Sequence, residues 1–183
     1  TTIKRENKRL IQLVADLLWL ARMDRKAIPL RQQLCCLNDL VDDLVEELEP
    51  LAIANQITLT NVFRVKKSIN VSGDCDQLYR LVYNLIVNAI QYTPSEGRVT
   101  VILERDASHA LIQVKDTGIG IAPEHQKKIF DRFYRIQDDR SRSTGGSGLG
   151  LAIAQSIARS HSCKLSVRSE LGQGSTFIFQ LPL

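Results

Sequence analysis

The chain has 183 residues, 44% of them hydrophobic and 24% charged, and its formal net charge at pH 7 is +4. This composition is typical of a globular domain with a sizeable core, and without a dense Lys/Arg run it argues against nucleic-acid binding. No apolar run reaches the roughly 18 residues of a spanning helix, so we expect no membrane contact from this segment. The four cysteines form no CxxC pair, which predicts neither a metal site nor a disulfide and favours a reducing, cytoplasmic location.

The first predicted element is a helix over residues 4–24. Apolar residues recur there at steps of three and four, as in a bundle or coiled-coil seam: Leu10, Leu13, Leu17 and Leu20. Pro29 interrupts the pattern. We therefore divide the chain into a helical-bundle segment, residues 1–28, and a domain, residues 29–183. Because the chain opens at Thr1 and enters the helix at once, we expect it to be a piece of a longer protein, with or without a membrane anchor elsewhere.

The remaining elements alternate between helices and hairpins. Periodicity and turn signals predict helices over 37–54, 75–92 and 123–131 and behind the glycines at 145–150, and strands over 56–63, 98–106, 109–116, 164–170 and 174–183. This mixture indicates an α+β fold rather than a doubly wound parallel sheet.

The helix predicted over 75–92 carries a polar stripe beside its apolar face. Arg80, Asn84, Asn88 and Gln91 follow one another at steps of four, four and three. Two asparagines next to a core must be satisfied. Either their amides bond to neighbouring backbone, or their oxygens face a hard cation such as Mg²⁺ and the phosphates that it accompanies.

The second motif is "DTGIGI", residues 116–121, at the end of a predicted strand. An ionised Asp116 only accepts hydrogen bonds, so it would match the exocyclic amine of adenine and reject the carbonyl oxygen of guanine. Gly118 and Gly120 would permit close approach of a ligand. The alternative is an ordinary hairpin turn with a glycine pair.

The third motif, "GGSGLGLAIAQ" at 145–155, loads a helix entrance with glycines, which suggests a phosphate at the helix N-terminus. It is neither of the two common phosphate loops. Leu151 stands where the Walker A loop needs lysine, and the dinucleotide fingerprint lacks its last glycine and its preceding strand. A flexible turn before a helix remains the alternative for this stretch taken alone.

The order of these motifs is more specific than any one of them. With "NLIVNAIQYT", "DTGIGI", "IFDRFYR", "GGSGLGLAI" and "GQGSTF" in sequence, residues 34–183 resemble the catalytic and ATP-binding domain of sensor histidine kinases. Residues 4–24 resemble the end of their dimerisation and phosphoacceptor helix. The resemblance implies a two-layer α/β sandwich of the Bergerat type, with a mixed, mostly antiparallel sheet covered by helices.

The resemblance also implies a site for ATP and Mg²⁺. Asn88 would bind Mg²⁺ with Asn84 near the phosphates, Asp116 would hold adenine, and residues 136–147 would form a lid. Arg135 is a candidate phosphate contact, with an ordinary surface arginine as the alternative, and it joins Asn84 and Asn88 as a candidate catalytic residue. The other implied nucleotide-site residues are Gln91, Tyr92, Gly118, Gly120, Gly146, Ser147, Gly148, Leu149, Gly150 and Thr176.

The implied function is transfer of the ATP γ-phosphoryl group to a histidine upstream of Thr1, and from there to an aspartate of a response regulator. The implied partners are that regulator and, in the full-length protein, a second copy joined through the upstream helical domain. His109, His125 and His161 are not expected to replace the upstream histidine, so the chain alone should not autophosphorylate.

Two other functions are possible. Related ATP hydrolases carry a glutamate where Asn84 stands, and asparagine cannot act as a base. A non-catalytic nucleotide-binding or dimerisation module is weakly favoured by Gln91, where the family usually has lysine.

Overall fold

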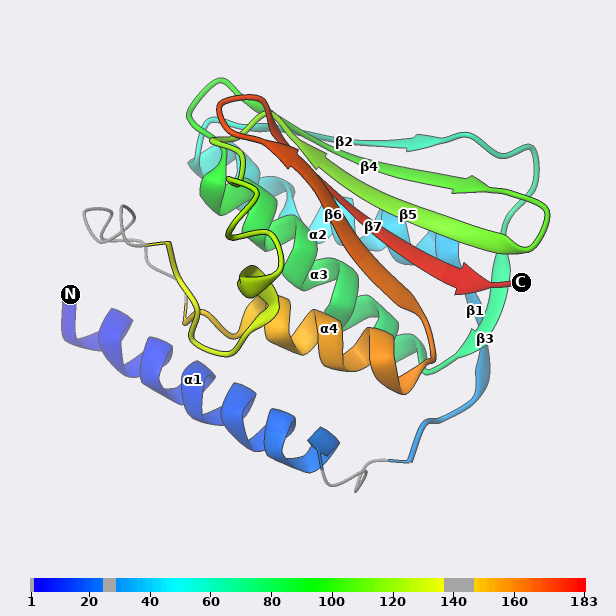
Figure 1. The fold of residues 1–183 in the computed structure, drawn as a ribbon, viewed down its shortest axis with the longest axis horizontal. Coiled ribbons are helices and arrows are strands. Elements are labelled where there is room, and N and C mark those ends of the chain that lie inside the picture. Colours follow the sequence, from blue (N-terminus) through cyan, green and yellow to red (C-terminus); the bar gives the residue numbers. More distant parts are fainter. Residues whose placement is uncertain (1, 25–28, 137–146) are drawn as a thin grey trace.

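The computed structural model describes residues 2–24, 29–136 and 147–183. Its elements follow one another as drawn in Figure 1. The helices are α1 Thr2–Asp24, α2 Leu37–Ala54, α3 Cys75–Tyr92, the 3₁₀ turn η1 Lys128–Phe130 and α4 Gly150–Ser160. The strands are β1 Gln33–Cys36, β2 Thr58–Phe63, β3 Asn70–Gly73, β4 Arg98–Arg105, β5 His109–Asp116, β6 Lys164–Glu170 and β7 Gly174–Pro182.

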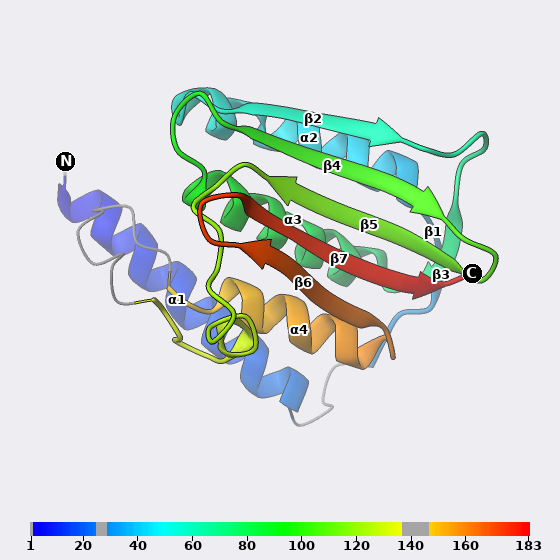
Figure 2. The same ribbon diagram turned by 45° about the horizontal axis from the view of Figure 1, so that its top comes forward.

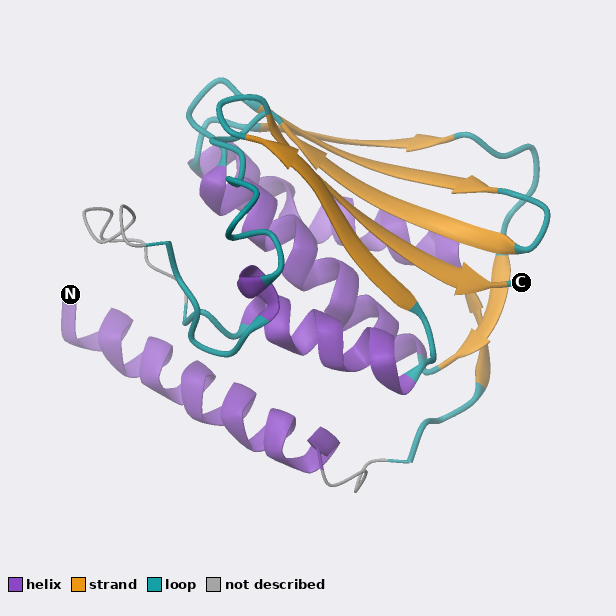
Figure 3. Cartoon of the chain, in the orientation of Figure 1, coloured by secondary structure: helices purple, strands orange, loops and turns teal. Residues whose placement is uncertain are grey.

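The main sheet has the order β2-β4-β5-β7-β6, in which β2 and β4 are parallel and the other neighbours antiparallel. A separate two-stranded ladder joins β1 to β3. Helices α2, α3 and α4 lie together on one face of the main sheet, as Figures 2 and 3 show. The α+β fold, with a mixed and mostly antiparallel sheet in two layers, is thereby confirmed.

The core lies between the sheet and these helices. Every second residue of the central strands points inward, so Val114 of β5 and Phe177 of β7 are fully buried. The helix α3 contributes Leu78, Leu81 and Leu85, whose exposure is 1% or less. Its first residues are organised by Asp74, whose side chain accepts a hydrogen bond from the Gln77 backbone N–H and so caps the helix.

Helix α1 packs on the side of α4 that faces away from the sheet (Figure 2). Leu20 is completely buried in the common core, whereas other apolar side chains of α1 remain exposed: Leu10, Ile11, Val14 and Leu18. Of the helices that the structure describes, none combines the length and the apolarity needed to cross a membrane. The division of the chain at residues 28 and 29 stays a prediction.

Three expectations from the sequence are wrong. Residues 123–131 form turns and the short η1 rather than a continuous helix, and there Gln126 donates to the carbonyl oxygens of Ile121 and Ser169. The strands β1 and β3 were missed because each has only four residues. Cys35 and Cys75 form a disulfide with a Cα–Cα distance of 5.6 Å, although 40 positions separate them in the sequence.

The packing of α1 predicts a difference between two leucines of that helix. Leu20→Ala should lower the free energy of unfolding by about 2–4 kcal/mol, because it leaves a cavity at a fully buried position. Leu18→Ala, at a position that is 56% exposed, should change it by less than about 0.5 kcal/mol. Urea unfolding of both variants measures the difference, and equal effects would contradict the packing of α1 described here.

Candidate functional site

A cavity of about 920 Å³ opens between α1, α3, the segment after β5 and the start of α4. Most of the residues singled out from the sequence line it: Asn84, Asn88, Gln91, Tyr92, Asp116, Gly120, Arg135, Ser147, Gly148 and Gly150. Segments from four distant parts of the sequence therefore meet around one space, which the sequence motifs alone could not establish.

The polar stripe of α3 forms one wall of this cavity. The Nδ2 amide of Asn84 donates to the Arg80 carbonyl oxygen at 2.9 Å, one turn earlier in the same helix. Its Oδ1 faces Gly150, where an added Cβ atom would lie 3.2 Å from that oxygen. Asn88 makes no side-chain hydrogen bond to the part of the chain that the structure describes. Each of the two alternatives predicted from the sequence therefore fits one asparagine. The Asn84 amide bonds to backbone, and the Asn88 amide is available to a ligand.

Asp116, the last residue of β5, also lines the cavity and is only 5% exposed. Its Oδ1 accepts hydrogen bonds from the backbone N–H groups of Gly118, at 2.8 Å, and Ser175, at 3.1 Å. Burial raises the pKa of this carboxyl above its ordinary value, and the two N–H donors oppose that rise. Because both donors hold the same oxygen, the other oxygen is left for a ligand donor.

The glycines of "DTGIGI" make room for protein backbone. A Cβ atom on Gly118 would lie 2.5 Å from the Tyr92 carbonyl oxygen, at the end of α3. Gly120 has a φ of +69°, and a Cβ atom there would lie 2.0 Å from the Glu170 carbonyl oxygen. These glycines therefore press the loop against α3 and β6, which sets the position of Asp116.

Gly148 and Gly150 hold the entrance of α4 in a similar way. Gly148 has a φ of +72° and packs on the backbone of Phe133, whose N–H donates to the Gly148 carbonyl oxygen at 3.0 Å. The lid expected over residues 136–147 falls almost entirely on segment 137–146, which lies outside the described residues and includes Gly146. Leu149 is fully buried, so its side chain belongs to the core.

The strand register separates two neighbouring residues of β7. Thr176 pairs with Lys115 and does not line the cavity, whereas Ser175 does line it and donates its N–H to Asp116. Alternation along β7 could have indicated this, because Ser175 has the same parity as the buried Phe177 and Phe179.

The sequence reasoning also missed the contribution of α1. Asp16 is 8% exposed, and its Oδ1 accepts a hydrogen bond from Arg80 Nη2 at 2.6 Å. The guanidinium carbon of Arg80 lies 4.6 Å from the centre of the Trp19 ring, a cation–π contact. In the sequence, the sign of this role was Asp16 itself, an acidic residue placed among the leucines of residues 4–24. These contacts make α1 a wall of the cavity.

The charged groups around the cavity limit its chemistry. The acidic residues that line it are Asp16 and Asp116, and no histidine lines it in the described ranges. Those ranges also hold no cluster of three His, Cys, Asp or Glu side chains that could bind a metal. A metal ion here would take amide oxygen from the protein and its other ligands from the bound molecule and water.

Two glycines of equal backbone conformation test the close packing of the loop. Gly120 and Gly172 both have positive φ, but only Gly120 has backbone where a Cβ atom would lie. Gly172→Ala should lower the free energy of unfolding by about 1 kcal/mol from backbone strain alone. Gly120→Ala should cost at least about 2 kcal/mol more, since the loop must also move. Thermal unfolding compares them, and equal losses would contradict the contact with Glu170.

Comparison with known proteins identifies the family. Residues 73–183 match the family described as histidine kinase-, DNA gyrase B- and HSP90-like ATPase. The chain is 52% identical over 182 residues to the sensor histidine kinase RppB of Synechocystis sp., covering 100% of this chain and 40% of that protein. It is 37% identical over 177 residues to the sensor protein SrrB of Staphylococcus aureus, covering 97% of this chain and 30% of that protein.

Its structure is also similar to that of full-length ShkA in complex with AMPPNP, with a TM-score of 0.87 and 28% sequence identity over 100% of this chain and 37% of that one. The chain spans less than half of the length of these relatives. The resemblance drawn from the motif order is confirmed. The matched region includes all of α3, Asp116 and β7 and so contains both Asn88 and Asp116. The chain therefore belongs to the histidine kinase-, DNA gyrase B- and HSP90-like ATPase family, and within it to the sensor histidine kinases.

Proposed function

We propose that this chain binds ATP with Mg²⁺ in the cavity and serves as the catalytic part of a histidine kinase. The γ-phosphoryl group would pass to a histidine upstream of Thr1 and then to an aspartate of a response regulator. The observation that carries this proposal is the pairing, in one cavity, of a buried carboxylate with a row of amides on α3.

The end of the cavity at Asp116 suits adenine. Since Oδ1 already accepts two backbone hydrogen bonds, Oδ2 would accept the exocyclic amine of the base. An ionised carboxylate offers no donor, so guanine would place its carbonyl oxygen against a negative charge. Tyr92 and Ile119 line the same space and would pack against the ring.

The end of the cavity at α3 and α4 suits phosphates. Asn88 has an amide without a partner in the described chain, and one or two protein oxygens are what Mg²⁺ uses when phosphates and water complete its shell. The ion would neutralise charge on the phosphates during transfer. Gly148 and Gly150 let the start of α4 approach them, and Arg135 and Gln91 line the same region.

Transfer is favoured over hydrolysis by what the two acidic residues at the cavity do. Asp16 accepts a hydrogen bond from Arg80, and Asp116 accepts two from backbone. Asn84 has no basic group and donates to its own helix. Because Asp16 is bonded to Arg80 and the open oxygen of Asp116 is assigned to adenine, no carboxylate in the described lining is left to activate a water molecule against the γ-phosphate.

The partners follow from the same proposal. The exposed apolar side chains of α1, Leu10, Ile11, Val14 and Leu18, would pack against a second copy in a homodimer of the longer protein. A response regulator would receive the phosphoryl group. We place this segment in the cytoplasm, where ATP and such regulators occur, whatever the anchoring of the whole protein.

The assignment of adenine to Asp116 predicts the effect of one substitution. Asp116→Asn should weaken the binding of a non-hydrolysable ATP analogue by about tenfold to a hundredfold, because the charge-assisted hydrogen bond to the base is lost. Asp106→Asn is the matched control, since Asp106 is an exposed residue of the turn before β5. Calorimetric titration measures both affinities.

Unchanged affinity in Asp116→Asn, or no binding by the unmodified chain at millimolar nucleotide, would show that the cavity is not the nucleotide site. Steady ATP turnover by the unmodified chain would favour a hydrolase instead.

The role of Asn88 predicts a change in metal dependence. Asn88→Ala should reduce the gain in nucleotide affinity that Mg²⁺ provides by at least about tenfold, while affinity measured in EDTA changes little. Asn55→Ala, at the exposed end of α2, is the control. Titrations with and without Mg²⁺ separate the two effects. A parallel loss in both conditions would mean that Asn88 acts on the nucleotide and not on the metal.

A further inference from the structure

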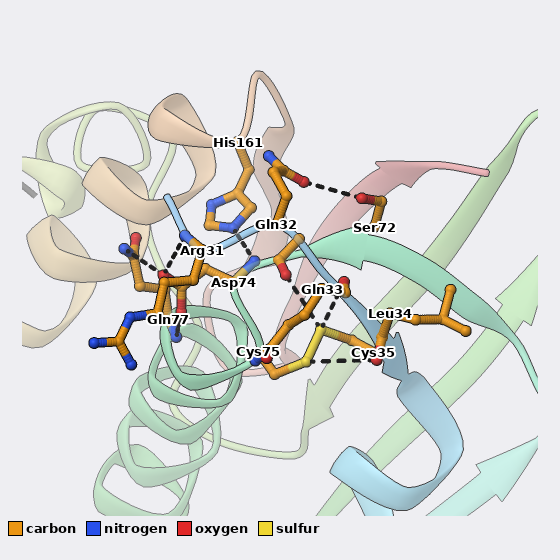
Figure 4. Close-up of a disulfide and its surroundings, with 11 residues drawn as sticks. Arg31, Gln32, Gln33, Leu34, Cys35, Ser72, Asp74, Cys75, Gln77 and His161 are labelled. Carbon is orange, nitrogen blue, oxygen red and sulfur yellow. Dashed lines mark hydrogen bonds between the residues drawn. A yellow bond between two sulfur atoms is a disulfide. The ribbon is translucent and has the colours of Figure 1, made fainter. Parts of the chain in front are cut away.

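Residues 31–35, which lie between α1 and α2, are bonded to residues 72–75 (Figure 4). The backbone N–H of Arg31 donates to Asp74 Oδ2 at 3.2 Å, and Ser72 Oγ donates to Gln32 Oε1 at 3.0 Å. Three residues after Gln32, Cys35 of β1 forms a disulfide with Cys75, the first residue of α3. Two hydrogen bonds and one disulfide thus join this segment to the end of β3 and the start of α3.

We propose that Cys35 and Cys75 form a reversible thiol–disulfide site that reacts with low-molecular-weight thiols and disulfides of the glutathione class, and that its state decides whether β1 stays fixed to α3. The proposal rests on the proposed function for its consequence, because α3 carries the amides of the nucleotide site. In a reducing compartment, a disulfide between two protein cysteines is typically transient and redox-responsive rather than a permanent crosslink.

The two sulfur atoms differ in access. Cys35 is 2% exposed, whereas Cys75 is half-buried at the surface end of α3. The residue beside Cys35, Leu34, is 76% exposed, so the corner itself lies at the surface. An external thiolate would therefore attack Cys75 Sγ and leave Cys35 as the departing sulfur.

Carbonyl oxygens lie near both sulfur atoms and could accept from the thiols once reduction lets the two sulfurs move apart. The carbonyl oxygens of Gly73 and Gln33 lie 3.5 and 3.7 Å from Cys35 Sγ, and that of Leu34 lies 4.0 Å from Cys75 Sγ. Each thiol of the reduced pair would have a carbonyl within reach of its weak S–H donor. The dithiol and the disulfide can therefore both exist in this fold.

The oxidation step balances with a glutathione-type disulfide as the oxidant. The Cys75 thiolate attacks one sulfur of that disulfide, forming a mixed disulfide and releasing one thiolate. The Cys35 thiolate then attacks Cys75 Sγ and releases the second. The protein thiols lose two electrons and two protons, and the oxidant gains them as two small thiols. Reduction reverses both steps.

The consequence reaches the cavity through α1 and α3. Without the crosslink, β1 is held by a four-residue ladder to β3 and by the start of α2, which follows it directly and whose Leu37 is fully buried. The residues before β1 keep the hydrogen bonds from Arg31 to Asp74 and from Ser72 to Gln32. Residues 25–32 connect α1 to β1, and α1 contacts Arg80, five positions after Cys75. Oxidation therefore limits how far α1 can move from the nucleotide site.

The other two cysteines provide internal controls. Cys36 follows Cys35 in β1, and neighbouring residues of a strand point to opposite faces. Cys163 is partly buried, and burial raises the pKa of its thiol to about 11, so it is a poor nucleophile near neutral pH. Both are free in the structure.

The test equilibrates the whole chain in glutathione buffers of increasing oxidised fraction, quenches with acid, labels free thiols and maps them by mass spectrometry. Cys35 and Cys75 should lose the label together in one two-electron transition, while Cys36 and Cys163 keep it. Cys36→Ser should keep the transition, and Cys75→Ser should abolish it. Hydrogen exchange of the backbone amides of residues 33–36 should be at least about tenfold faster in the reduced chain, with the buried amides of α3 unchanged.

A pair that stays reduced at every buffer ratio, or that crosslinks through Cys36, overturns the proposal. So does a pair that oxidises without slowing exchange in β1, because the site would then hold nothing in place. Titration with the ATP analogue, run on both redox forms, reports on the proposed function separately. Loss of nucleotide binding in both forms alongside a normal thiol transition would overturn the nucleotide site and leave the thiol site standing.

Discussion

The burial of one face of α3 between the sheet and α4 determines the geometry of the site. Leu78, Leu81 and Leu85 are almost inaccessible, and each such side chain contributes about 2 kcal/mol when removed from water. That packing fixes the orientation of α3 about its own axis, and in this orientation Asn84 and Asn88 face the cavity. Placing amides beside a core costs free energy, and the burial of the leucine face offsets that cost. The site therefore depends on apolar packing that no ligand touches.

The same helix organises its surroundings at both ends. At its start, Asp74 caps the helix and its backbone N–H donates to His161 Nε2, which ties α3 to the end of α4. At its end, the Tyr92 carbonyl oxygen accepts from Ile119 N–H and lies against Gly118. The loop that follows Asp116 is therefore positioned relative to α3 by backbone contacts.

Local patterns in the sequence allowed the fold class to be predicted, and the family resemblance indicated the polar residues of α3, Asp116 and the glycines around the start of α4 among those that line the cavity. Steps of four along residues 80–88 place side chains on one face of a helix wherever that helix lies. The Asp16–Arg80 contact and the Cys35–Cys75 bond could not be predicted, since each joins residues from distant segments. Thr176 was chosen from a motif although only the register of β7 decides which face it occupies.

The most direct test of this account is a crystal structure of the chain with a non-hydrolysable ATP analogue and Mg²⁺. We expect the exocyclic amine of adenine within hydrogen-bond distance of Asp116 Oδ2, and Mg²⁺ bound by the side-chain oxygen of Asn88 and the phosphates. A nucleotide bound in this cavity in the reverse direction, with its phosphates toward Asp116, would contradict the account, as would a nucleotide bound elsewhere on the chain.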